Sequence, residues 1–307
     1  MDIIGKRKIF YIISGIAIVI SILCLIFWGF NFGIDFKGGT LIELDFSPAG
    51  HAVDINKVKD VFFADSSIKS LSVQKAGSNS VLIRGEGIDK DKYNGLKDKI
   101  KESAGDFNEA TFETVGPTVS SDLQRKAFLS VGIASLAIII YLAIAFRKVQ
   151  KPANSWRFGI AAVVALLHDL LIMAGLFSIL GHFYTNIVVD SLFVTALLTV
   201  LGFSVHDTIV VFDRIRENLR RLAVSRDTSF SYIVNESIKQ TIARSINTSL
   251  TVLIALFAIL IFGGQSIFAF VLALIFGIII GTYSSVFVAA ALLVDWTEWS
   301  IRRESKS

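Results

Sequence analysis

The segment LFVTALLTVLGFSVHDTIVVFDRIREN, residues 192–218, combines a long apolar run with an interior His-Asp pair and a basic end. An apolar run of about 20 residues has the length that an α-helix needs to cross the hydrocarbon core of a bilayer. His206 and Asp207 interrupt this run before the arginines that follow it. The segment therefore predicts a membrane-spanning helix with an ionisable group inside its apolar part.

The composition of the whole chain agrees with a membrane protein. The 307 residues are 53% hydrophobic and 18% charged, whereas soluble domains have about 25% charged residues. A net charge of +4, from 30 basic and 26 acidic residues, gives no reason to expect a nucleic-acid partner. The only cysteine, Cys24, lies in an apolar run, and a single cysteine excludes a disulfide within the chain. We therefore expect a lipid bilayer as the surroundings of most of this chain.

Five further segments have the same apolar length, so the sequence predicts six spans in total. The predicted spans are residues 9–30, 127–146, 158–180, 187–212, 245–262 and 268–294. Helices are expected because only a helix satisfies all its backbone hydrogen bonds internally in lipid. The first span follows a basic start and lacks a small-residue cleavage site, so we interpret it as an uncleaved signal anchor.

Basic residues beside the spans predict the orientation of the helices. They precede the first span and follow the second, fourth and sixth: Lys6, Arg7, Lys8, Arg147, Lys148, Lys151, Arg157, Arg214, Arg216, Arg220, Arg221, Arg226, Arg302, Arg303 and Lys306. The links 181–186 and 263–267 contain no lysine or arginine. By the positive-inside rule, the segment 1–30 consists of a cytoplasmic start and the first span. The loop 213–244 and the tail 295–307 are also expected to be cytoplasmic. Residues 31–126 then lie outside the cytoplasm.

The long insertion at residues 31–126 predicts a folded domain. Strand patterns occur at residues 40–46, 70–74, 80–84 and 107–114, and helical spacing occurs at 54–64 and 89–103. A hairpin turn is expected at residues 76–79. The order βαββαβ is the ferredoxin-like arrangement, which hosts many functions. The predicted fold is therefore an α-helical integral membrane protein, with spans two to six at residues 127–294 and an inserted extracytoplasmic α+β domain.

The ionisable residues inside the spans are the candidate functional groups. Asp207 precedes Asp213 by six residues, and a helical rise of 1.5 Å per residue places it about 9 Å inside the apolar boundary. The fifth span opens with Arg244, followed by Asn247 and Thr248. Antiparallel packing of the fourth and fifth spans would bring Arg244 to the depth of Asp207. The pair is interpreted either as an ion or proton switch or as a structural ion pair.

His168 and Asp169 form a second His-Asp pair, midway along the third span. Asp169, with Asn247 and Thr248, is a candidate secondary relay; the alternative is a satisfied polar cluster between helices. Two such pairs also suggest a transition-metal site. Because neighbouring residues on a helix point about 100° apart, each pair directs only one ligand well, and we expect no metal. The chain contains no phosphate-binding loop or hydrolase motif, so we expect no catalytic residues and no cofactor.

Two further patterns concern helix packing. Gly277 and Gly281 form a Gly-x-x-x-Gly pair in the last span, which allows another helix to approach closely. That helix belongs either to this chain or to a partner subunit. From Ser229 onward, the spacing of apolar residues predicts an amphipathic helix that runs along the membrane interface into the fifth span.

Several motifs together resemble the SecD/SecF family of membrane proteins. The resembling residues are Gly33-Ile34-Asp35-Phe36-Lys37-Gly38-Gly39 after the first span, Val115-Gly116-Pro117 before the second, and residues 201–218, 244–249 and 281–285 in the fourth to sixth spans. The first motif is by itself only a turn at the outer mouth of the first span. His206 stands where the family usually has asparagine, and Ser120 replaces a usual glycine. The resemblance covers essentially the whole chain.

The resemblance implies a fold, a function and partners. It implies a bundle like that of resistance-nodulation-division transporters, paired with SecD beside the SecYEG channel in a bacterial or archaeal cell membrane. An ion motive force would move the outer domains and draw exported preproteins outward. Within the family, the residues at the positions of Asp207 and Arg244 are associated with proton coupling. Two alternatives stay open, namely a scaffold for SecD without ion coupling and a half-transporter for small molecules.

Overall fold

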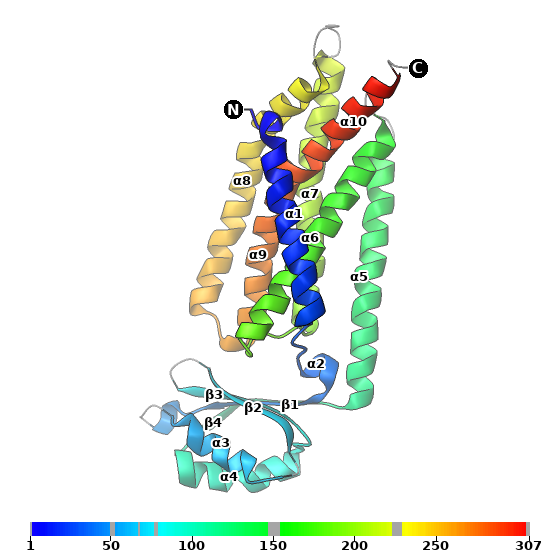
Figure 1. Ribbon diagram of the computed structural model, residues 1–307. Helices are drawn as coiled ribbons and strands as arrows, with labels where there is room; N and C mark the ends of the chain where they lie inside the picture. The colour runs from blue at the N-terminus through cyan, green and yellow to red at the C-terminus, as the bar shows by residue number, and fades with distance from the viewer. Residues whose placement is uncertain are drawn as a thin grey trace. The chain divides into compact units, whose positions relative to one another are not determined.

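The computed structural model describes residues 2–49, 53–66, 68–76, 79–146, 154–222 and 229–304. The chain forms two compact units (Figure 1). The helical unit comprises Met1–Phe30, Ser130–Ile187 and Leu192–Ser307, and the inserted domain comprises Asn31–Leu129 with Val188–Ser191. Some predicted features lie outside the described residues: the middle of the hairpin turn at 77–78, and Arg147, Lys148, Lys151, Arg226 and Lys306.

Six helices in the described part of the chain are long and apolar enough to cross a membrane, which confirms the predicted six-span architecture. They are α1 (Arg7–Phe27), α5 (Pro117–Ala145), α6 (Ser155–Phe183), α7 (Ser191–Leu222), α8 (Phe230–Phe262) and α9 (Phe268–Ser284). The last continues through a π-helical turn, Ser285–Ala289, into α10 (Ala290–Glu304). About half of the most apolar window is buried in α6, α7 and α9–α10, and much less in α1, α5 and α8. The first group therefore forms the centre of the helical unit.

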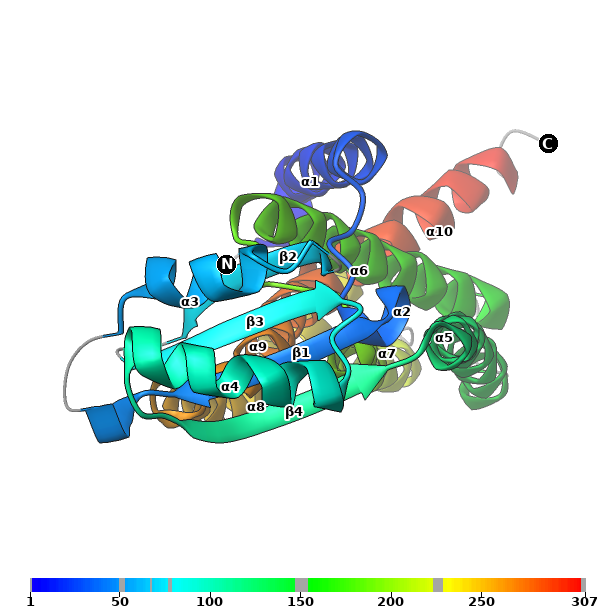
Figure 2. The same ribbon diagram turned by 90° about the horizontal axis from the view of Figure 1, so that it is seen from below.

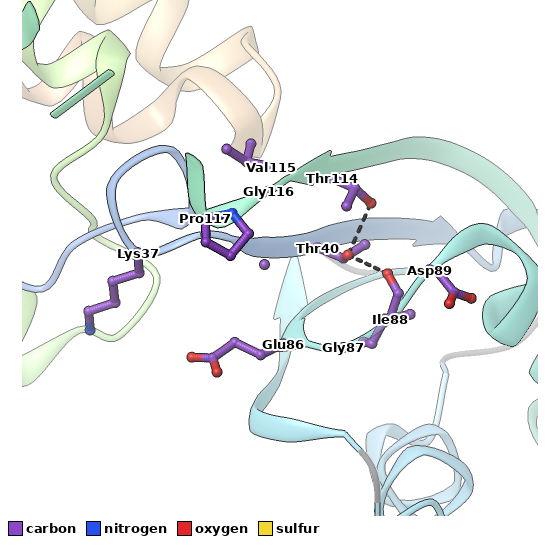
Figure 3. A pocket seen from close by; sticks show the side chains of 12 residues that line it. Lys37, Thr40, Glu86, Gly87, Ile88, Asp89, Thr114, Val115, Gly116 and Pro117 are labelled. Atoms are coloured by element: carbon purple, nitrogen blue, oxygen red, sulfur yellow. Dashed lines mark hydrogen bonds between the residues drawn. The ribbon is translucent and has the colours of Figure 1, made fainter. Parts of the chain in front are cut away.

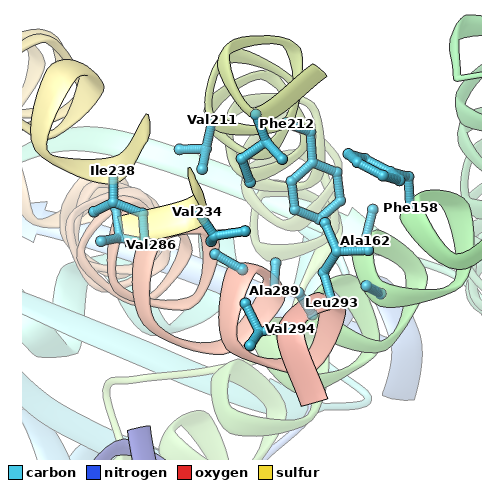
Figure 4. Close-up of a cluster of buried hydrophobic side chains, with 14 of the residues drawn as sticks. Phe158, Ala162, Val211, Phe212, Val234, Ile238, Val286, Ala289, Leu293 and Val294 are labelled. Atoms are coloured by element: carbon cyan, nitrogen blue, oxygen red, sulfur yellow. The ribbon is translucent and has the colours of Figure 1, made fainter. Parts of the chain in front are cut away.

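Apolar side chains from α6, α7, α8 and α10 form a continuous buried core (Figure 4). Phe158 and Phe212 meet edge to face, with ring centroids 5.1 Å apart. Val234 and Ile238, near the start of α8, are fully buried in the same core. The apolar side of the start of α8 is therefore covered by protein, and its predicted course along the membrane interface stays a prediction.

The two ends of the chain lie at the same end of the helical unit (Figure 1). Arg7 at the start of α1 forms ion pairs with Asp295 and Glu298 of α10, at 2.7 and 3.4 Å. The side-chain oxygen of Asn235 on α8 accepts hydrogen bonds from the backbone N–H groups of Ile3 and Ile4. These contacts hold the first residues of the chain against the start of α8 and against α10.

The inserted domain is a four-stranded antiparallel sheet in the order β2-β3-β1-β4. The strands are β1 (Gly39–Asp45), β2 (Lys69–Ala76), β3 (Ser80–Glu86) and β4 (Asn108–Val115). Helices α3 (Ile55–Phe63) and α4 (Lys90–Ala104) cover one face of this sheet (Figure 2). The alternating residues Ile42 and Leu44 of β1 are fully buried beneath them. The predicted ferredoxin-like order is confirmed, with one addition, the single-turn helix α2 (Ile34–Lys37).

An aspartate begins each of the two covering helices. Asp54 accepts a hydrogen bond from the backbone N–H of Asn56, and Asp89 accepts one from that of Lys92, at 3.0 and 2.8 Å. Such N-caps satisfy donors that have no partner in the first turn of a helix. The inserted domain thus fixes its own helices with ordinary capping side chains.

Gly277 and Gly281 of α9 lie directly against α7. A Cβ atom at Gly277 would come within 2.2 Å of Val200, and one at Gly281 within 2.9 Å of Ser204. The helix facing the Gly-x-x-x-Gly pair is therefore another span of this chain. Without a strong hydrophobic drive in lipid, such close backbone approach is a main source of helix association.

We expect Gly277→Ala to lower the melting temperature of the purified protein in detergent. The added methyl group overlaps Val200, and overpacking of this kind costs about 1–3 kcal/mol. Gly202→Ala on α7 is the matched control, because a Cβ at Gly202 meets no atom within 4 Å. Equal melting temperatures of the two variants would contradict the α7–α9 packing.

Candidate functional site

Asp207 lies inside the helical unit, with only 3% of its surface exposed. The hydroxyl groups of Ser245 on α8 and Thr282 on α9 are close enough to interact with its carboxyl group. Oδ2 of Asp207 and Oγ of Ser245 nevertheless both lack a hydrogen-bond partner of normal geometry. Since buried polar atoms are almost always paired, two orphaned oxygen atoms beside each other mark a place that can receive a further polar group.

More hydroxyl groups surround this carboxyl group. Ser249 and Thr282 share a hydrogen bond of 2.6 Å between α8 and α9. Thr208 and Ser285 share one of 2.9 Å between α7 and the π-helical turn. Asp207 therefore lies in a polar layer where α7, α8 and α9 meet. A π-helical turn next to such a layer fits the frequent occurrence of these turns at functional sites.

Asp169 on α6 forms a second buried cluster, which is more completely hydrogen-bonded. Its Oδ1 pairs with Nδ1 of His168 at 2.9 Å. Its Oδ2 accepts hydrogen bonds from Ser204 on α7 and Ser284 on α9, at 2.5 and 2.7 Å. Nε2 of His168 is the only atom of this dyad that lacks a partner. Asp169 therefore holds three helices together, whereas one carboxyl oxygen of Asp207 has no hydrogen-bond partner.

Ser204 connects the two clusters. Its hydroxyl group donates to Asp169, and its backbone carbonyl accepts hydrogen bonds from Thr208 and Ser285, both at 3.1 Å. Asp207 is one residue before Thr208 on the same helix. Ser204 and Thr208 thus lie on either side of Asp207 in the sequence of α7, and their hydrogen bonds link α7 to α6 and to the π-helical turn.

The structure does not bring Arg244 to Asp207. Arg244 is exposed on α8 and forms no ion pair with that carboxyl group. Ser245, the next residue, is buried and faces Asp207. Consecutive helical residues point about 100° apart, so the depth of Arg244 was predictable from the sequence but its direction was not. Asn247 and Thr248 are exposed on the same side of α8 as Arg244.

The side chains of the two His-Asp pairs differ in burial. His206 is exposed while Asp207 is buried, and His168 is buried with Asp169. No three His, Cys, Asp or Glu side chains converge anywhere in the part of the chain that the structure describes. The oxygen atoms around Asp207 come from one carboxyl group and several hydroxyl groups, which suits a proton or a hard monovalent cation better than a transition metal.

The two short motifs of the inserted domain lie side by side. Gly38 and Gly39 line a pocket of about 300 Å³ together with Val115, Gly116 and Pro117 (Figure 3). Gly38 has a φ of +79°, and a Cβ atom there would lie 3.4 Å from the carbonyl oxygen of Val115. A glycine is therefore required at position 38, where the chain enters β1 next to the end of β4.

Gly33 and Asp35, at the start of the first motif, contact the four residues Val188–Ser191. Sequence reasoning assigned these residues only a turn. The sequence signal that could have indicated the contact is the serine with which Asp35 pairs, Ser191. Ser191 begins α7, and a serine or aspartate near the start of a helix commonly caps it.

Comparison with known proteins matches most of the chain to one family. The family described as "Protein export membrane protein SecD/SecF, C-terminal" matches residues 95–299, and the "SecD/SecF GG Motif" matches residues 27–49. The protein translocase subunit SecF of Thermobaculum terrenum is 42% identical over 96% of this chain and 94% of its own length. This chain belongs to the SecD/SecF family. Residues 27–49 contain Gly33, Asp35, Gly38 and Gly39, and residues 95–299 contain Asp207 and Arg244.

Other SecD/SecF family members are longer than this chain. The protein translocase subunit SecDF of Bacillus subtilis is 36% identical over 99% of this chain but only 39% of its own length. The crystal structure of SecDF from Thermus thermophilus, a translocon-associated membrane protein, matches with a TM-score of 0.82 and 30% identity. The match covers 97% of this chain and 39% of that chain. This chain therefore corresponds to about two fifths of those relatives.

We expect Asp169→Asn to destabilise the helical unit and Asp207→Asn to leave its stability unchanged or higher. Asp169 accepts hydrogen bonds from three side chains, and replacing one carboxylate oxygen by an N–H₂ group disrupts them at a cost of about 1–3 kcal/mol. Asp207 has no such complete set of donors. Melting temperatures in detergent would test this difference, and a larger loss for Asp207→Asn would contradict it.

Proposed function

We propose that this chain is a SecF-type subunit of the Sec protein translocase. With SecD it uses an ion motive force to assist the movement of exported preproteins through the SecYEG channel. Membership of the SecD/SecF family supports the translocation role. The buried, incompletely hydrogen-bonded carboxyl group of Asp207 supports the use of an ion.

Asp207 is the ion-binding group in this proposal. A carboxyl group inside a membrane bundle is costly unless its charge is balanced, and such groups commonly mark ion pathways. Oδ2 of Asp207 and Oγ of Ser245 lack hydrogen-bond partners, so a proton or a small cation would gain contacts with these two oxygen atoms. Binding and release would then change the packing of α7 against α8 and α9.

The exposed polar side of α8 is the contact with SecD. Arg244, Asn247, Thr248 and Thr251 are all exposed, although they lie on an apolar helix. An arginine facing lipid inside a span is costly, so a partner with acceptor groups is needed. Relatives named SecDF carry the corresponding region in a much longer chain, which supports an association with SecD. Arg244 would then modulate the charge of the ion site from the subunit interface.

The remaining assignments follow from this role. Asp169 is a secondary relay through Ser204, and Asn247 and Thr248 serve the same path at the SecD contact. The basic residues beside the spans support cytoplasmic termini, with the inserted domain outside the cytoplasm. There the domain acts on the emerging preprotein.

The test measures preprotein release from membranes of cells that contain SecD, with and without an ion gradient. We expect Asp207→Asn and Arg244→Met to abolish the stimulation by the gradient and to leave the basal release unchanged. Asp207→Asn removes the ionisable oxygen atom, and Arg244→Met removes the cation while keeping the length of the side chain.

Matched controls are available on the same helices. Asp213→Asn changes an exposed aspartate of α7 that is paired with Arg216, and Lys239→Met changes a cation of α8 that is paired with Glu236. Both should keep the response to the gradient. Equal stimulation in Asp207→Asn and in the native chain would refute ion coupling and favour a scaffold for SecD.

A further inference from the structure

Asp35 caps α7 from a distant part of the chain. Its Oδ2 accepts a hydrogen bond from the backbone N–H of Ser191 at 3.0 Å and another from the Ser191 hydroxyl group. Ser191 is the first residue of α7. An anionic acceptor on the first N–H groups of a helix is favoured both by hydrogen bonding and by the helix dipole. The carboxylate of the first motif therefore holds the start of the fourth span.

Backbone hydrogen bonds reinforce this contact. Phe32 and Val189 form a parallel β-bridge. The N–H of Gly33 donates to the carbonyl of Val189 at 2.9 Å, and the N–H of Val189 donates to the carbonyl of Asn31 at 2.8 Å. The residues that enter the inserted domain are thus paired with the residues that enter α7.

Side chains pack closely against this pairing at Gly33. A Cβ atom at Gly33 would lie 3.1 Å from Asp190 and 3.3 Å from Val188. Burial lowers the pKa of Arg84 on β3, and the carboxylate of Asp190 opposes this effect by attraction. The segment Val188–Ser191 therefore belongs to the inserted domain by packing and charge, although it precedes a membrane span in the sequence.

The helix that begins at this contact also carries the ion site. Asp207 lies sixteen positions after Ser191 in the uninterrupted helix α7, which corresponds to about 24 Å along the helix axis at 1.5 Å per residue. A helix transmits displacement along its axis because its hydrogen bonds run in that direction. A shift of α7 at Asp207 therefore acts on Ser191 and on whatever holds it.

We propose that the Asp35–Ser191 contact is the mechanical link that passes the movement of α7 to the inserted domain. Asp35 is a positioning residue in this role, because it acts through α7 and not on the ion. The inference rests on the proposed function, since it requires an ion-driven movement at Asp207. It gives Asp35 of the Gly-Ile-Asp-Phe motif a role beyond the formation of a turn.

The first experiment compares Asp35→Ala with Asp89→Ala in the release assay. Both variants lose an aspartate that caps a helix, but Asp89 begins α4, which stays within the inserted domain. We expect Asp35→Ala to reduce the gradient-stimulated part of release about fivefold or more, the lower range of ordinary coupling between sites. Asp89→Ala should keep it. Ser191→Ala, which removes one of the two donors, should give an intermediate loss.

The second experiment reports movement directly. Spin labels are placed at Lys99→Cys in the inserted domain and at Phe183→Cys on α6, both exposed positions, in a Cys24→Ser chain assembled with SecD in vesicles. We expect an ion gradient to change the distance between the labels in the chain with Asp35 and to change it little with Asp35→Ala. An unchanged response in Asp35→Ala would overturn the link.

Labelling of Asp207 by an apolar carbodiimide separates failure of the link from failure of the proposed function. With Asp35→Ala we expect unchanged labelling of Asp207 and unchanged protection by the coupling ion, because the ion site is intact. Loss of both labelling and stimulation would show a general structural defect and contradict the link. If Asp207→Asn keeps the response to the gradient, the proposed function fails, and the link fails with it because it requires an ion-driven movement at Asp207.

Discussion

The helical unit depends on one constraint: inside a membrane, an ionisable side chain without a partner is costly. Asp169 meets this requirement through His168, Ser204 and Ser284, which come from three different helices. Ser204 of α7 and Ser284 of α9 both reach Asp169 where the two helices approach closely, beside Gly281. The close approach of the helices and the hydrogen bonds of Asp169 therefore occur at the same place.

The hydrogen bonding of Asp207 is incomplete, in contrast to that of Asp169. The same bundle that supplies three donors to Asp169 leaves Oδ2 of Asp207 and Oγ of Ser245 without any. A protein that satisfies one buried carboxyl group and not its neighbour retains the second at a cost to stability. Functional sites commonly carry such costs to stability, because a carboxyl group whose hydrogen bonds are already complete gains little from binding an ion.

Much of this architecture could be predicted from the sequence, because it follows from periodicity. The six spans and the βαββαβ order of the inserted domain depend on which residues are apolar and how they are spaced. The direction of a single side chain is not set by that pattern. Arg244 and Ser245 are neighbours in one motif, yet one is exposed and the other faces Asp207. The Asp35–Ser191 contact joins residues far apart in the chain, and no local spacing indicates it.

The two faces of α8 explain why one short motif contains both an arginine and several hydroxyl groups. Ser245 and Ser249 are buried in the interior of this chain, whereas Arg244, Asn247 and Thr248 are exposed. In lipid such a polar surface is stable only when another protein covers it. The helix therefore connects the buried carboxyl group of Asp207 to the exposed polar side chains of α8. Asp207 also lies on α7, the helix whose first residue, Ser191, donates hydrogen bonds to Asp35.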